Sequence, residues 1–170
     1  ITMGIAKSSD VYVWQVSKGV LNKTPTRLSI PYTNPSYYYS VEPMPVGTDG
    51  FVGAINGNDF SGIALLTKTM QADLQLSGIV TSDCKVKKYG GRVYLAYTAY
   101  VSGKGALLRI CDITDPQLAS LRNPILEAWM DSKQPNANGT MDADMAVING
   151  KLYALFACTN IGLRVYKLEK

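Results

Sequence analysis

Apolar and polar residues alternate along most of this chain, in short stretches separated by turn-forming residues. The clearest stretch, Gly150–Leu168, holds a glycine, an apolar strand, a short polar turn and a second strand. The same order of features occurs at Gly91–Ile113 and at Gly50–Thr67. Alternation with a period of two on both sides of a short turn is typical of a β-hairpin. The pattern therefore predicts three related hairpins.

The remaining segments also favour extended structure. Thr2–Ala6 and Val11–Val16 predict a further hairpin at the start of the chain, and Leu118–Leu121 predicts a single helical turn. Asp131–Thr140 is polar, contains Pro135 and Gly139, and predicts a long surface loop. The other predicted strands are Arg27–Tyr32, Tyr37–Val46, Ala72–Val80, Ser82–Tyr89, Pro124–Met130 and Met141–Ile148.

The glycines that open the three hairpins mark a repeat. Gly50, Gly91 and Gly150 are 41 and 59 residues apart, and superposing the copies on them gives a unit of four strands. Four strands at a period of about 40–50 residues are the signature of a propeller blade. We therefore predict an all-β, propeller-like domain of four-stranded antiparallel blades over residues 1–170, with repeats at roughly 1–36, 37–80, 81–131 and 132–170.

The predicted blades hold three, four, four and three strands, which is too few for a closed ring. An open arc would leave strand edges and apolar sheet faces without partners. We therefore expect the chain to be part of a larger propeller, which missing sequence or another chain completes.

One copy carries a family resemblance. The segment Leu107-Leu-Arg-Ile-Cys-Asp-Ile-Thr-Asp-Pro116 resembles the LVIVD-type propeller repeat, an apolar strand that ends in Asp, a hydrophobic residue, Ser or Thr, Asp and Pro. The copy at Gly162–Leu168 keeps the strand, whereas those at Val11 and Ile63 lack the Asp-Pro. The resemblance implies a secreted or surface-anchored bacterial propeller, often a lipoprotein, and supplies no catalytic motif. From this resemblance we expect the chain to lie outside the cytoplasm, in the periplasm, at the cell surface or secreted.

Composition excludes several kinds of chemistry. The chain contains no histidine, so Ser-His-Asp, Cys-His and His-metal mechanisms cannot be completed within it. The net charge of +4 is dispersed, apart from Lys85, Lys87 and Lys88, so no nucleic-acid partner is predicted. No apolar run reaches the roughly 20 residues that span a bilayer. Cys84, Cys111 and Cys158 form no metal-binding or redox motif, and we expect buried free thiols.

The loops at one end of the predicted sheets form a candidate binding face. In a propeller, the innermost strands begin on the face that also carries the turns between the second and third strands. Tyrosine and asparagine side chains on loops held by a rigid sheet suit stacking against, and hydrogen bonding to, a glycan or protein ligand. The alternative is that these tyrosines alternate between core and solvent along an ordinary strand. The candidate binding residues are Tyr37, Tyr38, Tyr39, Asn58, Asp59, Tyr100 and Asn160.

Three carboxylates recur at one position of the repeat. Counting back eight residues from each marker glycine gives Glu42, Asp83 and Asp142, with Asp144 as a further inward-facing acid. A ring of carboxylates near an axis would hold Ca²⁺ or Mg²⁺, or would orient a water molecule for hydrolysis. The alternative is that each acid caps its own turn by accepting backbone N–H bonds. We favour turn caps, and we also assign Asp112 and Asp115 to turn formation.

These observations predict a non-enzymatic, extracytoplasmic scaffold that binds a glycan or protein partner through its loop face, without a cofactor. The competing hypothesis is a metal-assisted hydrolase or lactonase-like propeller, with the acids Glu42, Asp83 and Asp142 near the axis.

Overall fold

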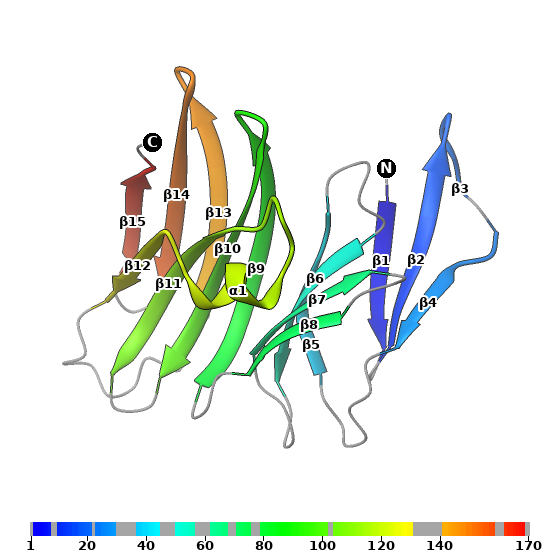
Figure 1. Cartoon of the computed structure of the whole chain (residues 1–170), viewed down its shortest axis with the longest axis horizontal. Helices are drawn as coiled ribbons and strands as arrows, with labels where there is room; N and C mark the ends of the chain where they lie inside the picture. The colour runs from blue at the N-terminus through cyan, green and yellow to red at the C-terminus, as the bar shows by residue number, and fades with distance from the viewer. Residues whose placement is uncertain are drawn as a thin grey trace.

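The protein is an all-β molecule of successive antiparallel sheets (Figure 1). It was examined as a computed structural model, which describes residues 2–7, 10–21, 23–29, 37–44, 50–56, 62–67, 71–75, 79–101, 104–130, 141–158 and 162–168. The first sheet holds β1 (Thr2–Lys7), β2 (Asp10–Ser17), β3 (Val20–Leu21) and β4 (Thr26–Ser29). The second holds β5 (Tyr37–Pro43), β6 (Gly50–Asn56), β7 (Gly62–Thr67) and β8 (Gln71–Gln75). The third holds β9 (Ile79–Tyr89), β10 (Arg92–Val101), β11 (Gly105–Asp112) and β12 (Leu126–Trp129), and the fourth holds β13 (Met141–Ile148), β14 (Lys151–Cys158) and β15 (Gly162–Lys167).

The second, third and fourth sheets are meanders, in which strands that follow one another in the sequence pair side by side. In the first sheet, β1, β3 and β4 all pair with β2. Between β11 and β12 lies α1 (Leu118–Arg122), the only helix among the described residues. The predictions of an all-β protein with antiparallel sheets and of one helical turn near Leu118 are confirmed.

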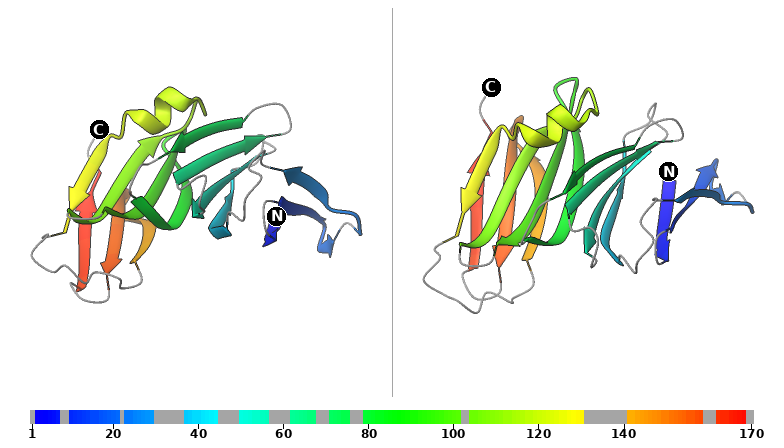
Figure 2. Two further views of the ribbon diagram at one scale, coloured as in Figure 1. Left: turned by 90° about the horizontal axis from the view of Figure 1, so that it is seen from below. Right: turned by 60° about the horizontal axis from the view of Figure 1, so that its bottom comes forward.

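The first strands of the four sheets form a row. β1 contacts β5, β5 contacts β9, and β9 contacts β13. The two ends of this row lie far apart, with the N-terminal sheet at one end of the molecule and the C-terminal sheet at the other (Figures 1 and 2). The molecule is therefore an open stack of sheets, with the row of first strands running through it.

Two apolar cores join the last three sheets. The core between the second and third sheets includes Val52, Leu65, Leu95 and Tyr97, all fully buried. The core between the third and fourth sheets includes the alternate residues of the third sheet, whose side chains point to its other face, among them Ala96, Leu108 and Ile110. Because side chains of adjacent residues point to opposite faces of a strand, the third sheet is covered on both faces.

Tight turns explain two of the marker glycines. Gly90 and Gly91 have φ of 57° and 81°, and Asn149 and Gly150 have φ of 49° and 71°. Two consecutive residues with positive φ are characteristic of the type I′ turn, which suits the twist of a two-residue hairpin. Gly50 is instead the first residue of β6. It is therefore not equivalent to Gly91 and Gly150.

One strand prediction is wrong. Ala72–Val80 is not a single strand, because β8 ends at Gln75 and Ile79 already belongs to β9 in the next sheet. The reason is the pairing of β9 with β10, which extends to Ile79 opposite Val101 and Val80 opposite Tyr100. The loop predicted at residues 131–140 lies outside the described residues.

Candidate functional site

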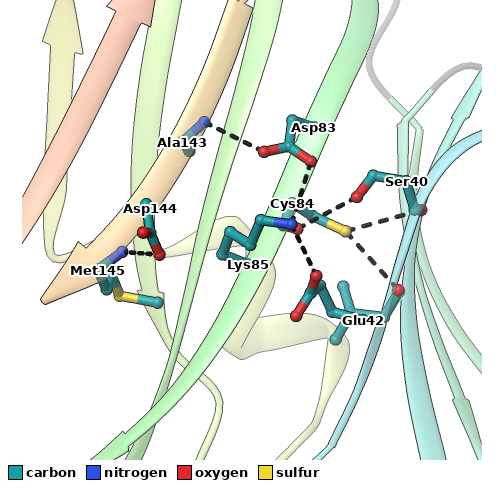
Figure 3. Close-up of polar contacts among 9 residues, drawn as sticks. Ser40, Glu42, Asp83, Cys84, Lys85, Ala143, Asp144 and Met145 are labelled. Atoms are coloured by element: carbon teal, nitrogen blue, oxygen red, sulfur yellow. Dashed lines mark hydrogen bonds and ion pairs between the residues drawn. The ribbon is translucent and has the colours of Figure 1, made fainter. Parts of the chain in front are cut away.

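A group of polar side chains lies where β5, β9 and β13 run side by side (Figure 3). Figure 3 shows that these three strands run in the same direction, so residues at similar positions along each strand lie beside one another. We call this group the inner-strand polar cluster. Its members are Ser40, Glu42, Asp83, Lys85 and Asp142.

Lys85 links the second and third sheets. Its Nζ lies 2.8 Å from Glu42 Oε1 and 3.9 Å from Asp83 Oδ1. Burial would lower the pKa of the Lys85 ammonium, but the hydrogen bond to Glu42 and the charge of Asp83 raise it above its ordinary value. The ammonium therefore stays charged and neutralises part of the negative charge of the cluster.

Asp83 and Asp142 link the third and fourth sheets. Asp83 Oδ2 accepts a hydrogen bond of 3.1 Å from Ala143 N of β13, and the Asp83 side chain is hydrogen-bonded to the Asp142 side chain. This bond to Asp83, together with burial, raises the pKa of Asp142 to about 6. Burial also acts to raise the pKa of Asp83, but its hydrogen bonds with Asp142, Ser40 and Ala143 lower it. The pair therefore shares one proton below about pH 6, with the proton on Asp142.

A buried thiol lies beside the cluster. Ser40 Oγ donates to the Cys84 carbonyl at 3.3 Å, and Cys84 Sγ donates to the Ser40 and Val52 carbonyls at 3.7 Å each. Burial raises the pKa of Cys84 to about 12. Since the thiolate is the reactive form, Cys84 is a structural residue. The prediction of buried free thiols is confirmed for all three cysteines, Cys84, Cys111 and Cys158.

The structure brings the three predicted acids close together, although they do not occupy equivalent positions of the repeat. Asp83 pairs with Thr98 and Asp142 with Ala157, in each case the seventh residue after the marker glycine. Glu42 pairs with Val52, only two residues after Gly50. The cause is the longer connection between β5 and β6, which shifts Glu42 along its strand so that it meets Lys85.

The turn-cap interpretation is wrong for Glu42 and Asp83. The bond from Lys85 to Glu42 and the bond from Ala143 to Asp83 both come from neighbouring sheets. The acids also lie within their strands and not at the start: β9 begins four residues before Asp83. Asp144 accepts a bond of 2.7 Å from the adjacent Met145 N and is exposed. The acids therefore connect first strands, and the sequence signal for this role was the lysine two residues after Asp83.

For Asp112, the assignment to turn formation is confirmed. Its Oδ1 accepts bonds from Thr114 N at 3.0 Å and Thr114 Oγ1 at 2.6 Å, and its Oδ2 accepts a bond of 2.8 Å from Arg92. The Asp115 carbonyl accepts bonds from Gln117 N and Ser120 Oγ, which start α1.

Of the predicted binding residues, Tyr37 and Tyr100 lie near the ends of their strands. Tyr37 pairs with Asn56, the last residue of β6, and Tyr100 pairs with Val80, the second residue of β9. Tyr100 is half-buried and packs against the core between the third and fourth sheets. Tyr38 and Tyr39 also lie in β5, while Asn58, Asp59 and Asn160 lie outside the described residues.

A second surface group was not predicted. On the outer strands of the third sheet, Glu127 accepts a bond of 2.7 Å from Arg109 Nε and one of 2.9 Å from Trp129 Nε1. Lys104 Nζ lies 6.0 Å from the centre of the Trp129 ring, and Arg109 donates to Tyr97 OH at 3.2 Å. The available signal was the alternation that places residues 127 and 129 on one face of a strand. The register that brings this strand opposite Arg109 could not be determined from the sequence.

In the described part of the chain, no group of three or more His, Cys, Asp or Glu residues is placed to hold a metal ion. The alternative hypothesis of a Ca²⁺ site at Glu42, Asp83 and Asp142 is not tested by this and stays a hypothesis. No helix within the described ranges is long and apolar enough to cross a membrane. A scan of protein-family models finds none that matches this chain, and a search of curated proteins finds no significant match.

Proposed function

We propose that this chain is an arc of a β-propeller that acts as a non-enzymatic binding scaffold. Support comes from the successive meanders that pack face to face with their first strands in a row. In a propeller, four-stranded antiparallel blades repeat in this way around a central axis. An extracytoplasmic, surface-associated location rests on the resemblance of Leu107–Pro116 to LVIVD-type repeats.

The observation that carries the proposal is the inner-strand polar cluster. Three successive first strands contribute two kinds of hydrogen-bonding group to one place, carboxylate acceptors and an ammonium donor. Lys85 remains 35% exposed and Glu42 23% exposed, so a ligand has access to both. Hydroxyl-rich ligands need both acceptors and donors, which carboxylates and lysine supply. A glycan is therefore the ligand class that the cluster fits best.

One observation favours a hydrolase as the second candidate. At neutral pH the Asp83–Asp142 pair combines a low-pKa carboxylate with a carboxyl group whose pKa is about 6. Such a pair resembles an acid and a base poised for catalysis. Glycosidases, however, keep their two carboxyl groups about 5 Å apart or more, whereas these two are hydrogen-bonded to each other. A Ca²⁺ ion bound by Glu42 and Asp83 would also have to displace the Lys85 ammonium.

Calorimetric titration with neutral oligosaccharides (cello-, xylo-, malto- and chito-oligosaccharides) tests the proposal. We expect at least one series to bind, and we expect Lys85→Met to weaken binding by about tenfold or more through the loss of one charge-assisted hydrogen bond. Arg92→Met is the control, since it breaks the Arg92–Asp112 pair at a distant site. Tyr100→Ala reports separately on the predicted loop face.

Two results would contradict the binding proposal. One is that none of the four series binds, and the other is that binding survives both Lys85→Met and Asp83→Asn unchanged. Release of nitrophenol from aryl glycosides, abolished by Asp142→Asn, would favour the hydrolase.

A further inference from the structure

Trp129 lies on the surface at the outer edge of the third sheet. It belongs to β12, the edge strand at the opposite side of this sheet from β9, and its side chain is 38% exposed. Among the aromatic side chains that the structure describes, no other is as exposed. Single exposed apolar residues are common on protein surfaces. The contacts that hold this ring, however, distinguish it from a residue that is merely exposed.

A chain of hydrogen bonds fixes the indole ring from the core outwards. The hydroxyl of the buried Tyr97 accepts a bond of 3.2 Å from Arg109, whose Nε donates to Glu127 Oε2 at 2.7 Å. Glu127 Oε1 in turn accepts a bond of 2.9 Å from Trp129 Nε1. Tyr97 pairs with Arg109 and Arg109 with Glu127, so the chain runs straight across β10, β11 and β12. A ring that is held in place before a ligand arrives loses little conformational entropy on binding.

The charges around the ring leave one positive charge unbalanced. Burial raises the pKa of Tyr97 to about 12, so its hydroxyl is neutral. Burial also acts to raise the pKa of Glu127, but the hydrogen bonds from Trp129 and Arg109 lower it below its ordinary value. The ionised Glu127 therefore balances Arg109. Lys104 forms no salt bridge in the described part of the chain, and its Nζ lies 6.0 Å from the centre of the Trp129 ring.

We propose that Trp129, Glu127 and Lys104 bind an acidic sugar, a pyranose ring that carries a carboxylate. The apolar face of the sugar ring stacks on the indole. Each carboxylate oxygen of Glu127 has a second acceptor site, which takes a bond from a sugar hydroxyl. The Lys104 ammonium, at the outer limit of the cation–π range, moves to the sugar carboxylate, which is a stronger, charge-assisted partner. The site lies at the opposite edge of the third sheet from the inner-strand polar cluster and does not depend on it.

A single-stranded nucleic acid also stacks its bases on exposed aromatic rings, but it fits these charges less well. It needs positive side chains along its phosphate backbone. Here the one lysine without a salt bridge, Lys104, lies close enough to Glu127 for its charge to act on that carboxylate, which would repel a phosphate. An acidic sugar needs one ammonium and one acceptor for its hydroxyl groups, and the site offers both. The observations therefore favour the sugar.

Fluorescence titration with acidic oligosaccharides tests the proposal. The variant Trp14→Phe leaves Trp129 as the only tryptophan, so the emission reports on this site. We expect trimers of galacturonate or of mannuronate to change the emission saturably. Their methyl esters should bind about tenfold more weakly, because an ester lacks the charge-assisted hydrogen bond to Lys104. Lys104→Met should weaken binding of the acids by a similar factor and leave binding of the esters unchanged.

Calorimetric titration extends the test to the ring itself. Trp129→Ala removes the stacking surface and should weaken binding of the acidic trimers by about tenfold or more. Two lysine variants are controls that should bind these trimers like the wild type. Lys151→Met removes an exposed lysine of the fourth sheet, and Lys85→Met changes the inner-strand polar cluster.

Four results would overturn the proposal. The first is that neither acidic series binds. The second is that the acids and their esters bind equally well, because the site would then not recognise the carboxylate. The third is that Lys85→Met abolishes binding of the acidic trimers, which would assign them to the inner-strand polar cluster. The fourth is tighter binding of a single-stranded oligonucleotide that Trp129→Ala and Lys104→Met both weaken, which would assign the site to nucleic acid.

Discussion

The third and fourth sheets are built from the same repeat but are packed differently. Both begin with a type I′ turn after the first strand, and both place Leu-Arg followed by Ile or Val at the same positions of the third strand, Leu108–Ile110 and Leu163–Val165. In the third sheet these apolar residues are fully buried, whereas in the fourth they are more than half exposed. The comparison teaches that the repeat specifies strands and their faces, while the neighbouring sheet decides whether a face becomes core.

Matched leucine truncations test this comparison most strongly. Leu108→Ala should lower the free energy of unfolding by about 2–5 kcal/mol, because it removes buried methyl groups and leaves a cavity. Leu163→Ala, at the equivalent exposed position, should change it by no more than about 0.5 kcal/mol in dilute monomeric protein. Urea denaturation of both variants measures the difference. Equal costs for both would show that the two faces are equally covered.

The polar links between the sheets should matter less than the apolar cores. Lys85→Met removes the ammonium that lies between Glu42 and Asp83 and leaves their carboxylates facing each other. We expect a loss of about 1–2 kcal/mol, between the values of exposed and buried ion pairs. Arg92→Met breaks a pair whose arginine is 61% exposed and should cost less than about 1 kcal/mol.

Denaturation at low salt and in 1 M NaCl separates the two roles of Lys85. A purely electrostatic link predicts that the difference between Lys85→Met and wild type shrinks at high salt. A difference that does not respond to salt would assign the effect of Lys85 to its packed methylene groups.

The sequence was a good guide to strands and a poor guide to register. Alternation located the hairpin at the start of the chain and those at Gly50, Gly91 and Gly150, but not the pairing of β3 with β2. The segment Asp112-Ile-Thr-Asp-Pro116 was correctly assigned to a turn, because the Asp112 carboxylate bonds Thr114 two residues away. These are local properties, which depend on residues close together in the chain. The exposure of Leu163 and Val165 was not predicted, because alternation shows that a strand has an apolar face but not whether a neighbouring sheet covers it.

The candidate site was predicted in part for the same reason. Glu42, Asp83 and Asp142 were singled out, and they do lie together, but their partners come from other sheets. Counting from glycines placed Glu42 wrongly, since Gly50 begins a strand whereas Gly91 and Gly150 form turns. Lys85 was noted only as one of three clustered lysines, with Lys87 and Lys88. Its role depends on the contact between β5 and β9, which no local pattern encodes.

Two buried threonines of the third sheet give a smaller test, because their substitution should change the free energy of unfolding in opposite directions. Among the described residues, Thr98 Oγ1 is buried without a hydrogen-bond partner, whereas Thr81 Oγ1 donates to Ile55 O at 2.8 Å. Thr98→Val should therefore stabilise the protein by about 1 kcal/mol, and Thr81→Val should destabilise it by a similar amount. Thermal unfolding of both variants measures these shifts. Destabilisation by both would indicate that Thr98 has a partner, for example a bound water molecule.

The last test concerns the proton shared by the third and fourth sheets. The pKa of Asp142 is raised to about 6 by its hydrogen bond to Asp83 and by burial. A carboxyl group whose pKa is higher in the folded state contributes stability at low pH, and this contribution is lost as pH rises from about 4 to about 6. Asp83, whose pKa is lowered, works in the opposite direction and loses its contribution as pH falls below about 4. Taken together, the two carboxyl groups predict that this contact is most stable at a pH between the pKa of Asp83 and the pKa of Asp142.

Asp142→Asn isolates the first of these titrations. The asparagine amide donates to Asp83 at every pH, so the variant should be at least as stable as wild type at pH 7 and should show little change between pH 4 and pH 7. The wild type should lose stability over that interval, and its Asp142 carboxyl carbon should titrate in an NMR experiment with a midpoint near 6. Asp144→Asn is the matched control, because Asp144 is exposed and bonds only the adjacent backbone among its described contacts. If the two variants follow the same pH profile, Asp83 and Asp142 do not share a proton, and the fourth sheet is held to the third by its apolar core and by the bond from Ala143 to Asp83.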